Sequence, residues 1–555
     1  MLTVPCAGGV NDDDFILMLG FWHLVRCHFL HRKKLTEKIV YEGELLMSGF
    51  EMNSLFLMEI FVASLLFILA VGVLCVVYMY IVDTRQTKHA IRRNFPVLGR
   101  FRYFFEHLGE FFRQYFFAMD REEMPFNRAT RSWVYRAAKN VDGTVAFGSS
   151  KSISEPGAVL FVTHPFPVLT EDYAATQTLI IGPHCRQPFE ASSFFNVSAM
   201  SFGAISQPAV SALSRGAAKA GCWINTGEGG LSPHHLEGGG DIVFQIGTAK
   251  YGVRDEAGKL DDEKLLAMAA HPQVKMFEIK ISQGAKPGKG GILPGVKVTQ
   301  VIAMTRGIPI GEASISPNGH ADIRNVDQLL DMLAHVREIT GKPAGFKLVV
   351  GGTPFFDELC EAVKRRGVEQ FAPDFITIDS GDGGTGAAPQ SLLDSAGLNI
   401  RETLPMVNDK LEDCGLRDRI RLIAAGKLIT PTDVAWALCA GADFVVSARG
   451  FMFALGCIQA MQCNKNTCPT GVATHDKDLQ QGLDPTDKAT RVANYVAKME
   501  HEVGAIAHSC GVCEPRRLNR SHARIVTELG QSVPLDILYR KQAEQNPLFP
   551  KPSQR

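Results

Sequence analysis

Residues 420–451, IRLIAAGKLITPTDVAWALCAGADFVVSARGF, contain two short apolar runs with a helical stretch between them. The first run ends in Gly-Lys and the second in Ala-Arg-Gly. Short apolar runs that end in glycine-containing turns and alternate with helices are typical of βα units, whose strands pair in parallel. The stretch therefore predicts part of a parallel sheet that is covered by helices.

The same pattern recurs on both sides of this stretch, between residues 191 and 480. Eight strand candidates with intervening helical segments occupy about the length of a closed (β/α)8 barrel. We therefore predict an α/β fold with a (β/α)8 TIM barrel over residues 191–480. The candidates are FFNVSAMSF, CWINTGEGG, MFEIKISQG, ASISPNG, AGFKLVVGG, FITIDSGDGG, IRLIAAGKL and DFVVSARGF.

An apolar segment lies far upstream of the barrel. Residues 60–82 carry no charge, and at about 1.5 Å rise per residue they are long enough to cross a bilayer. We predict a transmembrane helix over residues 55–82, with a buried core helix as the alternative. Arg85, Lys88, Arg92 and Arg93 follow at once, and the positive-inside rule then places the rest of the chain in the cytoplasm, as a single-pass membrane protein.

Three further segments surround these two. Met52 lies just before the apolar run, so we interpret residues 1–51 as an N-terminal extension from a misassigned start. Residues 83–190 include FRYFFEHLGEFFRQYFF, which fits amphipathic helices at the membrane face or against the next domain, and we predict a helical connector there. Residues 481–555 are expected to form a C-terminal helical tail.

Composition limits the function in two ways. Lysine plus arginine equal aspartate plus glutamate at 58 each, so net charge gives no support for a nucleic-acid partner. The 13 cysteines are an odd number without the spacing of a secreted disulfide scaffold, which indicates a reducing compartment.

Glycines and polar residues at the strand ends predict a cofactor site at the carboxyl-terminal rim of the barrel. The ends of the last two strands, Gly426-Lys427 and Ala448-Arg449-Gly450, lie where such barrels bind phosphate, and we place the phosphate of FMN there. Ordinary turn chemistry is the alternative for these residues.

Two other strands point to the flat ring of the cofactor. Lys347 lies inside the apolar run AGFKLVV, where a charge is costly without a partner, and an anionic reduced flavin would supply one; a lysine that reaches solvent is the alternative. Gly383, Gly384 and Thr385 follow another strand and would allow the backbone to approach the ring closely.

A set of cations follows the strand MFEIKISQG. Lys280, Lys286 and Lys289, with Gln283 among them, would suit a dicarboxylate substrate. A solvated charged loop is the alternative.

The segment CIQAMQCNKNTCP places three cysteines, Cys457, Cys463 and Cys468, close together before a proline. Thiolates are the usual ligands of iron-sulfur clusters, and three of them suit a [3Fe-4S] cluster. A zinc site completed by His475 and a set of unliganded cysteines are the alternatives.

Several longer motifs resemble the FMN-binding synthase domain of glutamate synthase, in its shorter membrane-anchored variants without a glutaminase domain. They occur in the family's order over residues 196–474, about half of the chain. The motifs are SAMSFGAIS, NTGEGG, IKISQGAKPGKGGILPG, KVTQVIAMTRG, SGDGGTGAAP, GLRDRIRLIAAGK and ARGFMFALGCIQAMQCNKNTCPTGVAT.

The resemblance implies an oxidoreductase that holds FMN and a [3Fe-4S] cluster. Such an enzyme would reduce 2-iminoglutarate, formed from 2-oxoglutarate and ammonia, to L-glutamate with electrons from ferredoxin or a reductase subunit. By motif, Met200 and Ser201 would lie against the flavin, and Gln283 and Lys347 would contact its ring. Glu228 would act as acid and base, and Lys286 and Arg306 would hold the substrate carboxylates. The cluster would be ligated by Cys457, Cys463 and Cys468.

Two departures from the family pattern leave other functions open. Without a glutaminase domain, ammonia must come from outside the chain. Ile292 stands where the family has a substrate-contacting glutamine, which favours an FMN enzyme for another amine or keto acid, for example of methylglutamate type. The third alternative is a membrane electron-transfer subunit, which binds the cofactors but no longer acts on a substrate.

Overall fold

The computed structural model describes residues 45–112, 116–386 and 388–539. The chain divides into two compact units, with the boundary between Ala118 and Met119. Most of the predicted N-terminal extension and the end of the predicted C-terminal tail lie outside the described residues.

The described part of the first unit contains the helices α2 (Leu45–Arg85), α3 (Ala90–Asn94) and α4 (Leu98–Phe112). Within α2, residues 56–85 form a helix that is long and apolar enough to cross a membrane, and its most apolar stretch is not buried. The carboxylate of Asp83 accepts hydrogen bonds from Arg100 Nε at 2.8 Å and from Val97 N at 3.1 Å. These bonds tie the end of α2 to the start of α4.

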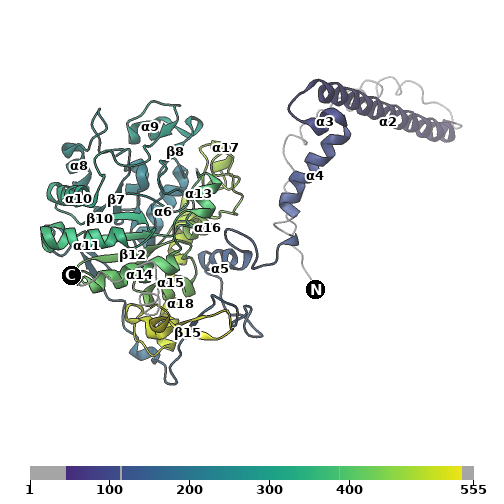
Figure 1. Ribbon diagram of the computed structural model, residues 1–555. Coiled ribbons are helices and arrows are strands. Elements are labelled where there is room, and N and C mark those ends of the chain that lie inside the picture. Colours follow the sequence, from purple (N-terminus) through teal and green to yellow (C-terminus); the bar gives the residue numbers. More distant parts are fainter. Residues whose placement is uncertain (1–44, 113–115, 387, 540–555) are drawn as a thin grey trace. The chain divides into compact units, whose positions relative to one another are not determined.

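The second unit is built around a closed barrel of parallel strands, which confirms the predicted fold class (Figure 1). The last barrel strand closes on the first, since Val446 of β13 lies opposite Asn196 of β4. In chain order the barrel strands are β4 (Phe195–Val197), β5 (Ile224–Asn225), β6 (Ile242–Ile246), β7 (Val274–Lys280), β10 (Ala344–Val349), β11 (Phe375–Asp379), β12 (Arg421–Ala425) and β13 (Phe444–Ser447).

One predicted strand was wrong. The run ASISPNG forms β9 (Ser314–Ile315), which pairs antiparallel with β8 (Ile292–Leu293) outside the barrel. The third barrel strand is instead β6, whose five residues are all buried. Pro317 cannot donate to a ladder, and Ile315 is exposed, so the ASISPNG run suits a short surface hairpin rather than a strand that is covered on both faces.

Helices surround the barrel, and many begin at a side chain that caps them. Ser206, for example, accepts a hydrogen bond from Ala209 N at the start of α6. The helices of this unit are α5 (Arg128–Ala138), α6 (Gln207–Ala220), α7 (Pro233–Leu236), α8 (Asp262–Ala269), α9 (Gln300–Arg306), α10 (Val326–Thr340), α11 (Pro354–Arg366), α12 (Val368–Phe371), α13 (Gln390–Ser395), α14 (Ile400–Asp413), α15 (Pro431–Cys439), α16 (Arg449–Leu455), α17 (Lys477–Gln480) and α18 (Pro485–Ser509).

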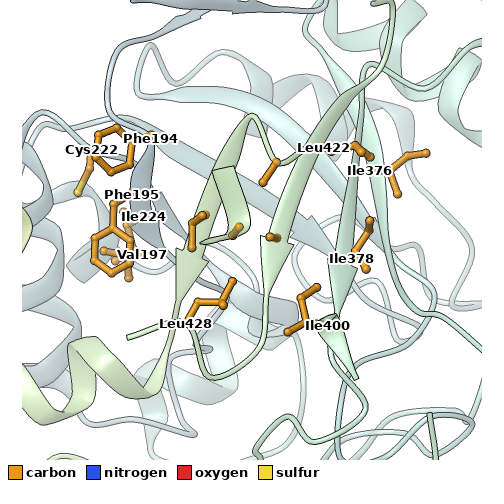
Figure 2. Packing of buried hydrophobic residues seen from close by; sticks show 14 of the residues in the cluster. Phe194, Phe195, Val197, Cys222, Ile224, Ile376, Ile378, Ile400, Leu422 and Leu428 are labelled. Atoms are coloured by element: carbon orange, nitrogen blue, oxygen red, sulfur yellow. The ribbon is translucent and has the colours of Figure 1, made fainter. Parts of the chain in front are cut away.

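Side chains of the barrel strands alternate between two hydrophobic cores. Ile376 and Ile378 of β11 point to the same side, into the core between the strands and the helices (Figure 2). Phe375, on the other face of β11, belongs to a separate core inside the barrel. The hairpin of β2 (Leu179–Ile181) and β3 (Phe189–Ala191) contributes to this inner core.

The segments on either side of the barrel are only partly helical. Beyond α5, the predicted connector contains β1 (Val159–Phe161) and the β2–β3 hairpin. The predicted helical tail contains β14 (Ala523–Val526) and β15 (Ser532–Pro534), and β1, β14 and β15 form one small antiparallel sheet. Residues 119–190 therefore belong to the barrel unit.

Candidate active site

Glu228 lies in the turn that follows β5 and forms an ion pair with Lys280 at the end of β7, with 2.7 Å between Oε2 and Nζ. The same ammonium donates to Gln283 Oε1 at 2.9 Å. A Cβ on Gly291 would come within 2.5 Å of Glu228 Oε1, so this chain segment passes directly against the Glu228 carboxylate. Residues 228, 280, 283 and 291 thus meet at the carboxyl-terminal rim of the barrel.

Charge controls the protonation of Glu228. Burial alone would raise the pKa of this carboxyl, but Lys280, Lys286 and Arg306 more than offset burial and hold the pKa below its usual value. The side chain is therefore ionised at neutral pH and can accept a proton.

Lys286 lies in the loop after β7 and is 3% exposed. Among the residues that the structure describes, its ammonium has one weak contact, with Gly290 O at 3.5 Å. Burial, with smaller contributions from Lys280 and Lys289, lowers the pKa of Lys286 to about 8, although Glu228 opposes the shift. A buried ammonium with so few acceptors is suited to receive an anionic ligand.

Arg306 ends α9 and is also buried. Its guanidinium donates to Ser314 Oγ at 3.2 Å and to Phe202 O at 3.1 Å, and it lies over the ring of Tyr251. No described residue accepts a hydrogen bond from its Nε. Because a carboxylate is the preferred partner of a guanidinium, the arrangement fits an acidic ligand at this place.

Lys347 points into the barrel and does not reach solvent. Its ammonium lies 3.2 Å from Asp379 Oδ2, so the solvent alternative was wrong and the side chain has a protein partner that the sequence did not reveal. Burial opposes the charge, but Asp379 and Glu278 raise the pKa of Lys347 above its usual value. Asp379 Oδ2 also accepts from Gly284 N at 2.9 Å and so fixes the loop that carries Gln283.

The predicted phosphate residues come together at the ends of β12 and β13. Lys427 Nζ forms an ion pair with Asp382 Oδ2 at 3.0 Å, and Arg449 donates to Asp382 O at 3.3 Å. A Cβ on Gly384 would lie 2.9 Å from Arg449 Nη1, so Gly384 borders the guanidinium. Two cations beside glycine-rich backbone fit the phosphate and ring of a mononucleotide.

The remaining predicted cofactor residues lie on the same rim. Met200 is buried, and Ser201 lies against the turn that carries Glu228. Gly450 packs closely against Tyr495 of α18, which leaves no room for a side chain at position 450. Four other predicted residues also lie at or beside the rim: Gly383, Thr385, Gly426 and Ala448.

Phe126 is a neighbour that the sequence did not suggest. Its ring lies under the Arg449 guanidinium, 4.6 Å from Cζ, although it precedes the barrel by many residues. An aromatic in a basic connector gives no signal of this role, because the contact exists only once the connector has folded onto the barrel.

The three cysteines lie in the loop after α16. Burial raises the pKa of Cys457 to about 12, and Cys463 and Cys468 add to the shift, so the three sulfurs are near enough to interact. Within residues 45–112, 116–386 and 388–539, no three His, Cys, Asp or Glu side chains are placed to hold a metal ion. The residue types suit a cluster, but the thiols are not arranged around one point.

Two residues brace this loop. Lys297 is buried and donates to Cys463 O at 2.7 Å and to Ala473 O at 2.6 Å. His475, the proposed fourth zinc ligand, is bonded through Nε2 to Gly203 O at 2.9 Å, so this nitrogen is already engaged.

Comparisons with known proteins show the family of the chain. The family model described as the conserved region in glutamate synthase matches residues 160–513. The chain is 37% identical to the glutamate synthase large subunit-like protein YerD of Bacillus subtilis (strain 168) over 516 residues, which cover 86% of this chain and 97% of that protein.

Two archaeal-type enzymes are also similar. The archaeal-type glutamate synthase (NADPH) of Thermotoga neapolitana is 35% identical over 330 residues, which cover 59% of this chain and 61% of that protein. The archaeal glutamate synthase (NADPH) of Archaeoglobus fulgidus is 34% identical over 331 residues, with coverage of 59% and 61%. Since the family match covers more than half of the chain and includes the whole barrel with its rim, the chain belongs to the glutamate synthase family of oxidoreductases.

Proposed function

We propose that this chain reduces 2-iminoglutarate, formed from 2-oxoglutarate and external ammonia, to L-glutamate. The observation that carries the proposal is the balance of charge around Glu228. Lys280, Lys286 and Arg306 surround this one carboxylate, so three cations face one anion. The two surplus positive charges match the two carboxylates of 2-oxoglutarate.

FMN is the cofactor that we propose for the rim. Lys427 and Arg449 would hold its phosphate, and Lys347 would lie under its ring. The ring would also contact Met200, Ser201, Gln283 and the backbone of Gly383, Gly384 and Thr385. When bound, FMN supplies the hydride for the imine carbon.

The chain's own residues would bind the substrate and move protons. Lys286 and Arg306 bind the two carboxylates and thereby fix the keto carbon near Glu228. The ionised Glu228 moves two protons in turn from the nitrogen to the oxygen. It takes the first from the ammonia nitrogen as that nitrogen adds to the keto carbon and passes it to the keto oxygen; it then takes a second from the same nitrogen and passes it to this oxygen, which leaves as water and gives the neutral imine. Lys280 holds Glu228 in place through their ion pair.

We further propose that Cys457, Cys463 and Cys468 ligate a [3Fe-4S] cluster and that electrons come from ferredoxin or a reductase subunit. The support is chemical: three thiols share one loop beside the rim, and the buried ammonium of Lys297 braces that loop. An EPR spectrum of the anaerobically purified, oxidised protein tests this part. A [3Fe-4S] signal that disappears in Cys463→Ala supports it, and an EPR-silent, iron-free protein contradicts it.

The membrane attachment is proposed from α2. Its exposed apolar side chains require a nonpolar surrounding, and Arg85, Lys88, Arg92 and Arg93 follow its end. We propose a single span with the barrel in the cytoplasm. Retention in the membrane fraction after carbonate extraction supports the span, and release into the supernatant contradicts it.

A second candidate function rests on Ile292. Its neighbour Gly291 lies against Glu228, while Ile292 itself is half exposed on β8. An apolar side chain at the edge of the site cannot hydrogen-bond a polar substrate group, which favours another amine or keto acid, for example of methylglutamate type.

Anaerobic reoxidation separates the two functions. The photoreduced protein is mixed with 2-oxoglutarate and ammonium, and absorbance at the flavin band is followed. Reoxidation that requires both compounds, and that is lost in Glu228→Gln, supports glutamate synthesis. Reoxidation only by a different keto acid or amine supports the second function, and a flavin that stays reduced with every substrate contradicts both.

A further inference from the structure

A buried carboxylate inside the barrel has no part in the proposed reaction. Glu278 of β7 is 3% exposed and lies one layer below the rim. Its oxygens accept hydrogen bonds from Asn225 Nδ2 at 2.9 Å, Gln245 Nε2 at 2.5 Å and Thr377 Oγ1 at 2.6 Å. Side chains from three other barrel strands are therefore committed to holding one carboxylate.

The layer below Glu278 is entirely different. Trp223, Met276, Phe375 and Phe444 fill the barrel there and form an apolar core with the β2–β3 hairpin. Replacing a buried charge by an apolar side chain of similar volume is often neutral or stabilising, so stability alone does not account for Glu278.

Glu278 lies near Lys347 in the interior of the barrel. Lys347 lines the same small cavity, of ≈ 10 Å³, as Glu278, Asn225 and Thr377, and Glu278 acts on it electrostatically together with Asp379. The cavity has room for about one water molecule, which could bridge polar groups of this layer. Asp379 is shared with the backbone of Gly284, so it is not committed to Lys347 alone.

We propose that Glu278 is a positioning residue, which holds the Lys347 ammonium at the floor of the rim and thereby sets the charge that a bound flavin ring meets. The inference rests on the proposed FMN site. Glu278 and Lys347 should therefore change the ease of flavin reduction in opposite directions, because their charges are of opposite sign.

The sign of each effect follows from electrostatics. Reduced flavin carries more negative charge than oxidised flavin, so a positive neighbour favours reduction and a negative neighbour disfavours it. In Glu278→Gln, Lys347 keeps Asp379 as its partner and its charge is less compensated, so the flavin is reduced more easily. In Lys347→Met, the flavin is reduced less easily.

The test is an anaerobic redox titration of the flavin in the full chain, followed by absorbance. We expect Glu278→Gln to raise the midpoint potential by about 30 mV, or about tenfold in the equilibrium constant for two-electron reduction, and Lys347→Met to lower it. Thr377→Val is the matched control, because it removes one hydrogen bond to Glu278 without changing a charge, and its potential should remain that of the wild type.

The outcomes separate this inference from the proposed function. If Glu278→Gln does not fold, Glu278→Asp keeps the charge but withdraws it by one methylene, and we expect a smaller rise. An unchanged potential in a folded, flavin-containing Glu278 variant overturns the inference alone, as does an equal rise in Thr377→Val. A wild-type protein that holds no flavin overturns the inference together with the proposed FMN site.

Discussion

One strand crosses two regions of the barrel that differ sharply in chemistry. In β11, Phe375 lies in the apolar core at the amino-terminal end, whereas Asp379, four residues later, lies at the rim beside Lys347. Both side chains point inward, because residues of equal parity share a face of a strand. Inside the barrel, stability and chemistry are therefore separated by depth: apolar side chains fill the amino-terminal end, whereas Glu278, Lys347 and Asp379 lie towards the carboxyl ends of the strands.

The largest effect is expected from a substitution in the apolar core at the amino-terminal end of the barrel. Phe375→Ala removes a ring that is fully buried, and we expect the free energy of unfolding to fall by about 3–5 kcal/mol. Chemical denaturation of the detergent-solubilised protein, followed by circular dichroism, measures the change. A loss below about 1 kcal/mol would mean that the lower core does not hold the barrel together.

A change at the rim should instead affect the substrate. Lys286→Met removes a cation that we assign to a substrate carboxylate, and we expect KM for 2-oxoglutarate to rise at least about 30-fold, since losing a charged partner costs about 2–4 kcal/mol. Lys286→Arg, which keeps the charge, is the control and should retain part of the affinity. Steady-state kinetics provide KM, and an unchanged KM in Lys286→Met would remove this residue from the site.

The pH dependence of KM sharpens the assignment of Lys286. Burial lowers the pKa of its ammonium to about 8, so the side chain is positive below that pH and loses its charge above it. An anionic substrate should therefore bind more weakly as the pH rises through about 8, with ammonium kept saturating. The rise in KM should disappear in Lys286→Arg, whose guanidinium stays charged; the same rise in both proteins would point to another group.

The smallest expected effect concerns the edge of the site. Ile292→Gln restores a polar side chain next to Gly291, and we expect kcat/KM for 2-oxoglutarate relative to 2-oxopentanoate to increase about tenfold. Competition between the two keto acids measures this ratio directly. A ratio that does not change would show that Ile292 takes no part in substrate selection.

Much of the barrel could be predicted from the sequence, because its strands are short apolar runs that end in glycine or polar residues. Seven of the eight strand candidates are barrel strands, and the predicted strand ends meet at one rim. The missed strand is β6, whose end is less rich in glycine and polar residues than the ends of its neighbours. The ASISPNG run has such an end but forms a surface hairpin. Local pattern cannot tell these apart, since closure of the barrel decides which run is buried.

The partners of the charged residues could not be predicted. The apolar neighbours of Lys347 predict a buried charge, but its pairing with Asp379 depends on the register between β10 and β11. The contact of Phe126 with Arg449 joins residues that are far apart in the chain. Such contacts are set by tertiary packing. The hydrophobic periodicity of a single segment carries no information about it.

An isotope experiment shows directly whether the rim makes L-glutamate from a keto acid and external ammonia. The photoreduced full chain is incubated anaerobically with 2-oxoglutarate and ¹⁵N-ammonium, and the products are analysed by mass spectrometry. We expect L-glutamate with ¹⁵N in its amino group, at up to one molecule for each two-electron reduced flavin, and none in Glu228→Gln. A folded, reduced, flavin-containing wild-type protein that forms no labelled glutamate would contradict it.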